Sequence, residues 1–375
     1  MEVKFSTALS EKATAEDAVR DISIKIKTQS GANIKYLLVF FTAHYNPVTL
    51  QDSLNRTIRP KNLWGFQAPL LVHDEKIANR GILAIAINGD EVQLKEVFTK
   101  NDAWESVEGA FRKELKDISG EKTFLFGLLP MGSNFKNYLR GINMSLGKSL
   151  PAVYAGYMKK FSFKNYVLLN NRIDEGLLSI AGKGISTEHL RMGGYVPLGK
   201  PFTITRTLPD HGLIMEINNK PAVEIYKHYF EEKFEQFKKS KFFPFYPLAI
   251  KENNTTRTIS VLDILEDGSL ACLGTVKEGL KANFSILHQP SLFGSIKRRV
   301  EPLTKSGEGI VFMVNSLLRK KILMDSYPEE IKAVKSALGD KHRLIGIYAD
   351  YTIFPDKQRA ELGMETGNLL LSLWK

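Results

Sequence analysis

The chain has 375 residues, of which 43% are hydrophobic and 25% are charged, which is typical of a globular protein and excludes a disordered one. No apolar run approaches the roughly 18 residues that a membrane-spanning helix needs, and the single cysteine, Cys272, excludes an intrachain disulfide. The formal charge of +11 comes from basic residues scattered among acidic ones, without the aromatic interleaving of a surface for single-stranded nucleic acid. We therefore expect a soluble, cytoplasmic protein with no membrane insertion and no nucleic-acid partner, and the length favours two domains.

Apolar segments follow one another in a fixed order near the start of the chain. The predicted elements are an amphipathic helix over 15–26, a buried strand over 36–43, a helix that starts at Asn46 and Pro47, and strands over 63–72 and 81–87. From residue 36 to residue 87 the order is strand, helix, strand, strand.

The same order returns twice, in a second unit over 123–182 and in a third at the end of the chain. The second unit has predicted strands over 123–129, 151–158, 165–171 and 175–182, with a helix after Gly132. The third has strands over 309–315, 343–351 and 367–374, with a helix over 328–338. Because the identity between the units is low, we interpret them as a repeated supersecondary pattern.

A glycine interrupts the strand after the helix in each unit. These glycines are Gly65, Gly156 and Gly346, and each has aromatic neighbours. A glycine inside a strand usually marks a bulge or the close approach of another backbone or a ligand. We therefore expect the three glycine-marked strands to face one another and to enclose a cleft.

The stretch between the second and third units has a different character. The connecting region over 182–220 is rich in glycine over 182–199 and has short predicted strands over 202–208 and 213–219. It leads to a predicted helix over 221–239, whose aromatic residues repeat at helical spacing and indicate a core. Three strands are then expected, over 258–265, 269–274 and 283–287. We predict the α+β (mixed α/β) class, with mixed sheets in two domains, 1–220 and 221–375.

Catalytic and metal-binding motifs are not found in the sequence. None of the seven histidines is paired at a metal-site spacing, and one cysteine cannot build a thiolate cluster. Lys183, between two glycines, lacks the spacing and the following hydroxyl of a phosphate-binding loop. We expect no catalytic residues, no metal and no cofactor, and we do not expect an enzyme.

Six segments of the chain have a recognisable family character. The most specific is GGYVPLGKPFTITRTLPDHGLIMEINNKPAVEIY, over 193–226, and the others are STALSEKATAEDAV, YLLVFFTAHY, DILEDGSLACLGTVKEG, GIVFMVNSLLRK and GIYADYTIFP. Together they resemble the FIST domains, N-terminal and C-terminal, of F-box and intracellular signal transduction proteins. The resemblance implies an N-type domain over 1–220 and a C-type domain over 221–375. It also implies a sensory protein that binds a small ligand, an amino acid or related metabolite, and acts on a signalling partner in trans.

Three segments depart from the family pattern, at 65–69, 316–319 and 346–352. The first lacks the family's cysteine, threonines and acid, Ser316 replaces a cysteine in the second, and Asp350 stands near the place of an acid in the third. We predict a ligand pocket where the glycine-marked strands meet. Its candidate polar contacts are Gln67, Tyr157, Arg206, Arg319, Asp350 and Tyr351.

Roles for three of these residues follow from their chemistry. Arg206 or Arg319 is expected to bind a carboxylate through bidentate hydrogen bonds, and Asp350 is expected to bind an ammonium group. The structural alternative is that the aromatic residues pack between the sheets and the charges are solvated. The functional alternatives are a protein-interaction scaffold without a ligand and an enzyme acting on a small metabolite.

Overall fold

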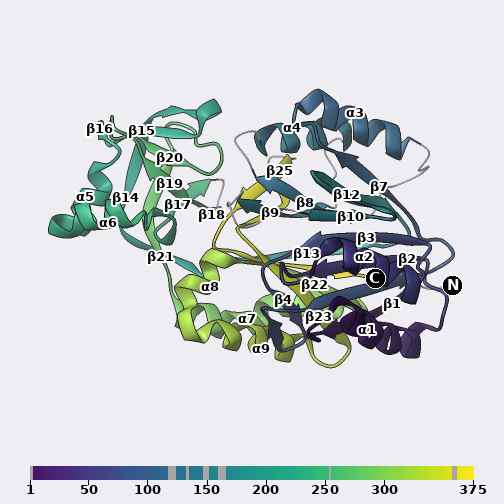
Figure 1. The fold of residues 1–375 in the computed structure, drawn as a ribbon. Helices are drawn as coiled ribbons and strands as arrows, with labels where there is room; N and C mark the ends of the chain where they lie inside the picture. Colours follow the sequence, from purple (N-terminus) through teal and green to yellow (C-terminus); the bar gives the residue numbers. More distant parts are fainter. Residues whose placement is uncertain are drawn as a thin grey trace.

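The computed structural model describes residues 3–116, 124–131, 135–146, 152–158, 166–252, 255–356 and 361–375. Three six-stranded sheets surround a common core, and an eight-stranded sheet lies beside them (Figure 1). The fold is mixed α/β, as predicted, and no helix in the described part of the chain is long and apolar enough to cross a membrane.

Each of the three repeated units has a first strand, a helix, a second strand, a helical segment, a third strand, a hairpin and a last strand. Unit one contains β1 (Lys4–Ser10), α1 (Ala15–Ser30), β2 (Tyr36–Phe41), α2 (Pro47–Thr57), β3 (Asn62–Gln67), β4 (Leu71–His73), β5 (Lys76–Ala78) and β6 (Ile82–Asn88). Unit two contains β7 (Gln93–Thr99), α3 (Trp104–Leu115), β8 (Phe124–Met131), α4 (Phe135–Leu146), β9 (Ala152–Met158), β10 (Tyr166–Leu169), β11 (Arg172–Glu175) and β12 (Leu177–Lys183). The first strand and the hairpin enlarge the predicted strand, helix, strand, strand unit.

Unit three follows the same plan but carries a long insertion after its first strand. It contains β13 (Thr187–Met192), α7 (Gln289–Lys305), β22 (Gly309–Ser316), α8 (Leu317–Leu323), α9 (Tyr327–Leu338), β23 (His342–Ala349), β24 (Tyr351–Asp356), β25 (Glu361–Glu365) and β26 (Leu369–Trp374). The insertion contains β14 (Tyr195–Leu208), β15 (Leu213–Ile217), β16 (Lys220–Pro221), α5 (Glu224–Phe230), α6 (Phe234–Ser240), β17 (Leu248–Glu252), β18 (Thr255–Ile259), β19 (Val261–Ile264), β20 (Leu270–Cys272) and β21 (Lys281–Leu287).

The three sheets exchange hairpins in a cycle. Sheet one has the order β1-β6-β2-β3-β10-β11, sheet two β7-β12-β8-β9-β24-β25, and sheet three β13-β26-β22-β23-β4-β5. Each sheet is therefore completed by the hairpin of another unit. In all three, the second and third strands are parallel and the other pairs antiparallel. The sheets are mixed, as predicted.

Two segments predicted as single strands, 63–72 and 343–351, are each split between two sheets. In the first, β3 ends at Gln67 and β4 pairs with β23, with Pro69 in the link between them. In the second, β23 ends at Ala349 and β24 pairs with β9. Both halves of each segment are buried, so the apolar run is continuous although the strand changes sheet. The sequence pattern therefore does not reveal the change. Four predicted boundaries lie outside the described residues: the start of the helix after Gly132 and the first residues of the predicted strands, 123, 151 and 165.

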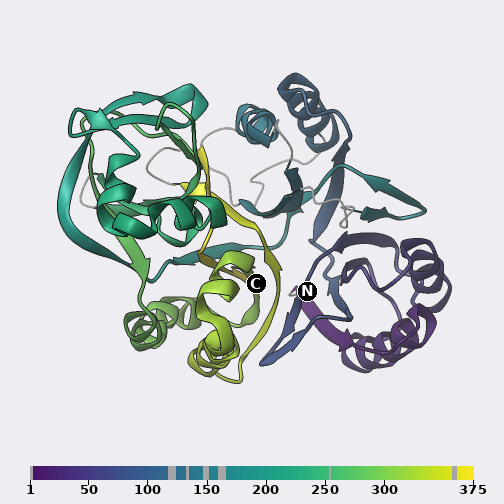
Figure 2. The same ribbon diagram turned by 60° about the vertical axis from the view of Figure 1, so that its left-hand side comes forward.

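The helices lie on the outer faces of the sheets, and the inner faces share one core (Figure 2). Alternation along β2 shows the arrangement, because Leu38 and Phe40 point to the shared core while Leu37 and Val39 pack under α1 and α2. Helices α3 and α4 cover sheet two, and α7 and α9 cover sheet three. The residues before and after 220 share this core, and the boundary between two domains at that position stays a prediction.

The insertion has a hydrophobic core of its own. Its sheet has the order β18-β17-β21-β14-β15-β20-β19, with β16 paired to β15. The helix predicted over 221–239 is interrupted, because Glu231 has a φ of 45° and separates α5 from α6. Its aromatic residues are core residues, as predicted: Tyr226 and Phe237 stack at 5.7 Å.

Candidate functional site

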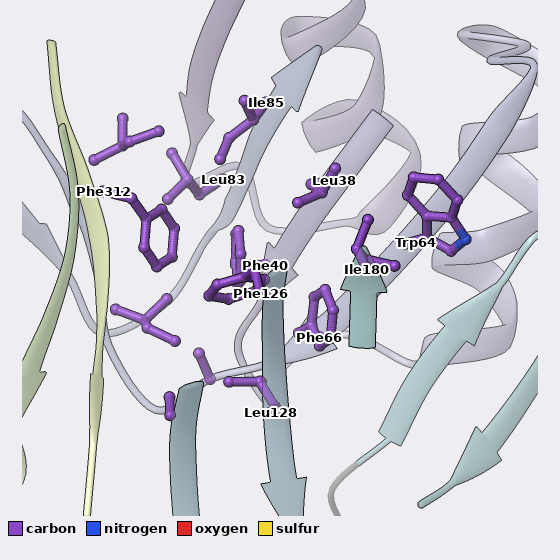
Figure 3. Packing of buried hydrophobic residues seen from close by; sticks show 14 of the residues in the cluster. Leu38, Phe40, Trp64, Phe66, Leu83, Ile85, Phe126, Leu128, Ile180 and Phe312 are labelled. Atoms are coloured by element: carbon purple, nitrogen blue, oxygen red, sulfur yellow. The ribbon is translucent and has the colours of Figure 1, made fainter. Parts of the chain in front are cut away.

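The place where the three sheets meet is filled by aromatic rings. Phe126 lies 5.7 Å from Phe40 and 4.9 Å from Phe312 (Figure 3). Phe312 in turn stacks on Trp374 at 4.9 Å. All four side chains are fully buried. The expectation of a ligand cleft at this meeting point is therefore wrong. The structure instead has aromatic rings packed between the sheets, which was one part of the structural alternative.

Two of the three strand glycines, Gly65 and Gly346, face away from that centre. A Cβ atom on Gly65 would lie 2.7 Å from the side chain of Leu168, which comes from the exchanged hairpin on the outer face of sheet one. At Gly346 it would fall on the backbone carbonyl of Met313 in the neighbouring strand. These two glycines thus allow close contact between strands and do not open a binding site.

Polar residues are buried instead at one end of unit three, where the insertion leaves the chain. We call this set the Arg319 cluster; it comprises Arg191, Gly193, Tyr195, Asn315, Ser316, Arg319, Glu330, Asp350, Glu365, Thr366, Gly367 and Asn368. Ser316 ends β22 and caps α8 by accepting a hydrogen bond from Leu318 N at 3.2 Å. This places Arg319 in the first turn of α8, with its side chain fully buried.

Arg319 forms a buried ion pair with Glu330 of α9. Its Nε donates to Glu330 Oε1 at 2.7 Å, and its Nη2 lies 2.6 Å from the same oxygen. Asn315 Nδ2 donates to the second carboxylate oxygen of Glu330 at 3.1 Å. The sequence predicted that Arg319 binds a carboxylate of a ligand. In the structure, Arg319 instead binds a carboxylate of the protein itself.

The other end of the same guanidinium group holds two loops. Its Nη1 donates to the backbone oxygen of Gly193, just before the insertion, and to that of Gly367, just before β26, the latter at 3.1 Å. Charged hydrogen bonds of this kind are stronger than neutral ones. Arg319 thus connects α8, α9, the start of the insertion and the end of the exchanged hairpin.

Hydroxyl groups extend the cluster towards Asp350. Ser316 Oγ accepts from Gly367 N at 2.9 Å and lies 3.2 Å from Thr366 Oγ1, which in turn donates to the backbone oxygen of Asp350 at 2.9 Å. Asp350 links β23 to β24, and its amide donates to Gly156 O of β9 at 3.1 Å. Arg319 and Asp350, two of the predicted site residues, therefore belong to one connected network.

Tyr351, the next residue, is buried in an apolar cluster between sheet two and the insertion. It packs with Ile353 and Leu362, and the cluster includes Leu273 of the insertion. Burial, and then the charge of Asp350, raise the pKa of the Tyr351 hydroxyl to about 12. The predicted residues Arg319, Asp350 and Tyr351 therefore all lie beside the insertion.

Tyr195, the first residue of β14, contributes a buried hydroxyl to the cluster. The ring is partly exposed, but its Oη atom is buried and has no hydrogen-bond partner. A Cβ atom on Gly367 would fall on this oxygen, so the hydroxyl lies directly against the backbone of Gly367. Burial raises the pKa of Tyr195 far above its usual value, whereas the nearby charge of Arg319 lowers it.

A second ion pair lies next to Tyr195. Glu365 Oε1 is 2.5 Å from Arg191 Nη1, and its Oε2 accepts a hydrogen bond from Asn368 Nδ2. Glu365 is 8% exposed, and its backbone oxygen accepts from Thr352 Oγ1 at 3.3 Å. The cluster therefore combines two arginines with two buried or nearly buried glutamates.

Unit one has a simpler version of the same arrangement. Gly81 N donates to Thr42 Oγ1 at 3.1 Å, as Gly367 N donates to Ser316 Oγ. The residue before the hydroxyl is apolar in unit one, Phe41, but is Asn315 in unit three. Units one and three thus share a serine or threonine at this place, whereas unit one lacks the ion pairs that unit three has.

The remaining predicted residues are not joined to this network by any hydrogen bond or ion pair seen in the described part of the chain. Gln67 is buried at the end of β3, and its Oε1 has no hydrogen-bond partner. Arg206 lies on β14 with its side chain 60% exposed, and it pairs with Glu216 at 3.4 Å. The side chain of Tyr157 lies outside the described residues. Ligand roles for these three stay predictions.

Of the cluster residues, only Arg319 and Asp350 were predicted as site residues; among those that the sequence reasoning missed are Tyr195, Glu330, Glu365 and Thr366. Glu330 had a detectable signal, because it lies one turn before Val334 on the apolar stripe of a predicted helix, where a carboxylate needs a buried partner. Tyr195 and Glu365 had no such signal. Among the described residues, no group of three histidine, cysteine or acidic side chains is placed to hold a metal ion.

Comparison with known families covers most of the chain. The FIST N domain matches residues 35–220, and the FIST C domain matches residues 222–350. The chain belongs to the FIST family. The cluster spans both matches and extends beyond the second, because Gly193 and Tyr195 lie in the N-domain match, Arg319 and Glu330 in the C-domain match, and Glu365 after it.

Comparisons with individual proteins give weaker likenesses. No curated protein matches the sequence. A cyanuric acid hydrolase from A. caulinodans aligns over 99% of both chains with 9% identity and a TM-score of 0.39. A chorismatase aligns over 100% of this chain and 99% of its own with 8% identity and a TM-score of 0.38. At these scores the likenesses carry no argument about function.

Proposed function

We propose that this FIST protein binds a small ligand, an amino acid or related metabolite, and passes its bound state to a signalling partner in trans. Membership of a family associated with small-ligand sensing supports the general function. The observation that carries the proposal for this chain is the Arg319 cluster, a buried polar network at the base of the insertion. The proposal includes a cytoplasmic location and no catalytic activity.

The position of the cluster suits a sensor. Arg319 holds the backbone at Gly193, where the insertion begins, and at Gly367, where the exchanged hairpin ends. A ligand shifts a conformational equilibrium only by the difference between its contacts in the two states. A ligand that contacts Arg319, Asp350 or Tyr351 acts where the insertion meets the three-sheet body, so it is able to change how the insertion is held.

Ligand binding and the location of the site are tested together. The purified protein is screened against amino acids and related metabolites by thermal shift, and hits are measured by calorimetry on the wild type, Asp350→Asn, Tyr351→Phe and Arg206→Ala. We expect weaker binding for the first two variants and unchanged binding for Arg206→Ala, because Arg206 is exposed and paired within the insertion. Hits that respond only to Arg206→Ala would contradict the site.

A second candidate function is a protein-interaction scaffold that takes no ligand. The solid aromatic centre between the sheets favours it, because the predicted cleft is absent there. Native mass spectrometry of the purified protein separates the two functions. A co-purifying small molecule that is lost in Asp350→Asn supports the sensor, whereas an unliganded protein with no hits in the screen supports the scaffold.

A further inference from the structure

We propose that the Arg319 cluster receives an uncharged oxygen acceptor of the ligand, such as a carboxamide or ketone oxygen, through the hydroxyl of Tyr195 and the Nη2 group of Arg319. This inference rests on the proposed ligand-binding function and defines the chemistry of its site. The proposed ligand group is uncharged, whereas the sequence predicted that Arg319 binds a ligand carboxylate.

The hydrogen-bond donors of Arg319 are not all used. A guanidinium group has five N–H donors. Nε donates to Glu330, and the two hydrogens of Nη1 are directed to the oxygens of Gly193 and Gly367. Nη2 lies 2.6 Å from Glu330 Oε1, but its N–H groups are not aligned with that oxygen. It is therefore a buried nitrogen without a hydrogen bond.

Tyr195 adds a second unused donor in the same place. Its Oη lies against Gly367, whose backbone oxygen accepts from Arg319. A buried hydroxyl without a hydrogen bond is costly, and such exceptions are rare in folded proteins. Gly367 therefore borders both side chains, because the Tyr195 hydroxyl lies against its backbone and Arg319 Nη1 donates to its oxygen. A single acceptor atom bound between the two side chains would use the hydroxyl and the neighbouring Nη2.

Charge balance determines what kind of acceptor fits. The cluster contains the cations Arg191 and Arg319 and the carboxylates Glu330, Asp350 and Glu365, and each cation is already paired. A ligand carboxylate would add a further negative charge to a cluster in which both cations are already paired, at a large cost when buried. A neutral oxygen accepts the same two hydrogen bonds without that cost.

Gly367 is required for this arrangement. Its φ is +77°, and any Cβ atom there would collide with the Tyr195 hydroxyl. Both the backbone conformation and the space thus restrict the position to glycine. The close approach keeps the hydroxyl beside Arg319, where the two donors can converge.

The first test compares ligands that differ in one group, a charged carboxylate or an uncharged carboxamide. Pairs of an amino acid and its amide, such as alanine and alaninamide, are titrated by calorimetry into the wild type and Tyr195→Phe. We expect the amide to bind at least tenfold more tightly than the acid, and Tyr195→Phe to weaken amide binding about tenfold, the value of one hydrogen bond between buried groups.

The outcomes separate this inference from the proposed function. Tighter binding of the acids, or equal amide affinity in Tyr195→Phe, overturns the acceptor site while ligand binding itself stands. If no metabolite in the screen binds the wild type, the proposed function fails and this inference fails with it.

A second test needs no ligand. Removing a hydroxyl that has no partner should leave the melting temperature of ligand-free Tyr195→Phe equal to or above that of the wild type. The matched control is Tyr226→Phe, whose hydroxyl donates to Tyr246 O at 3.0 Å and whose loss should lower the melting temperature. A similar decrease in both variants would show that the Tyr195 hydroxyl is already satisfied, and would overturn the inference.

Discussion

Replacing Arg319 by methionine tests whether the Arg319 cluster holds the insertion and the hairpin in place. The substitution leaves Glu330 buried with Asn315 as its remaining donor, and it removes the donor from two backbone oxygens. Breaking a buried ion pair by removing one partner costs about 3–5 kcal/mol. Against a total stability of about 5–15 kcal/mol for a typical protein, this is a substantial loss.

The assay is urea unfolding, followed by circular dichroism at constant pH. The matched control is Arg206→Met, which breaks an exposed pair with Glu216 and should cost less than about 1 kcal/mol. In the double variant Arg319→Met/Glu330→Met, part of the loss should return because no unpaired charge remains buried. If Arg319→Met costs no more than Arg206→Met, the structural reasoning about the cluster is refuted.

Three further changes test other parts of the structure. Phe126→Ala should cost about 3–5 kcal/mol in unfolding experiments, because the ring is fully buried between three sheets; a loss under 1 kcal/mol would contradict a packed centre. Gly65→Ala should destabilise the protein by about 1–3 kcal/mol through contact with Leu168, and Gly65→Ala/Leu168→Ala should lose less than the two separate changes together. Burial raises the pKa of the Cys272 thiol to about 12, so the folded state retains this proton more tightly than the unfolded state. Stability should therefore fall as the pH rises from about 9 towards 12, less steeply in Cys272→Ala, and the native thiol should not react with a thiol reagent at pH 8.

The buried strands of the repeated units could be predicted because their signal is local. The runs at 36–43 and 309–315 consist of apolar residues bounded by turn residues, and they form β2 and β22. The first strands β7 and β13 were missed, because they are partly exposed and mix polar with apolar residues. Their strand conformation depends on pairing with β12 and β26, which no local pattern reveals.

The exchange of hairpins could not be predicted from the sequence for a related reason. Whether β4 continues sheet one or joins sheet three changes which strand it pairs with, but not whether its residues are buried. Hydrophobic periodicity reports burial and not the identity of the partner. A similar limit led to the expectation of a cleft. The aromatic residues beside Gly65 do meet the other units at the centre, but the sequence does not show that their rings fill the space between the sheets.

The candidate site shows the corresponding limit for polar residues. Arg319 was named from a family segment and Asp350 from another, and the structure joins them through Ser316 and Thr366. Tyr195, which lies near Arg319 and Glu365, precedes Arg319 by more than the length of the insertion strands and helices. The charged cluster is absent from the equivalent place in unit one, where Phe41 stands in the position of Asn315. Because the fold is formed in unit one without these ion pairs, the architecture alone does not require them, and their position at the base of the insertion is the feature on which the proposed sensor function depends.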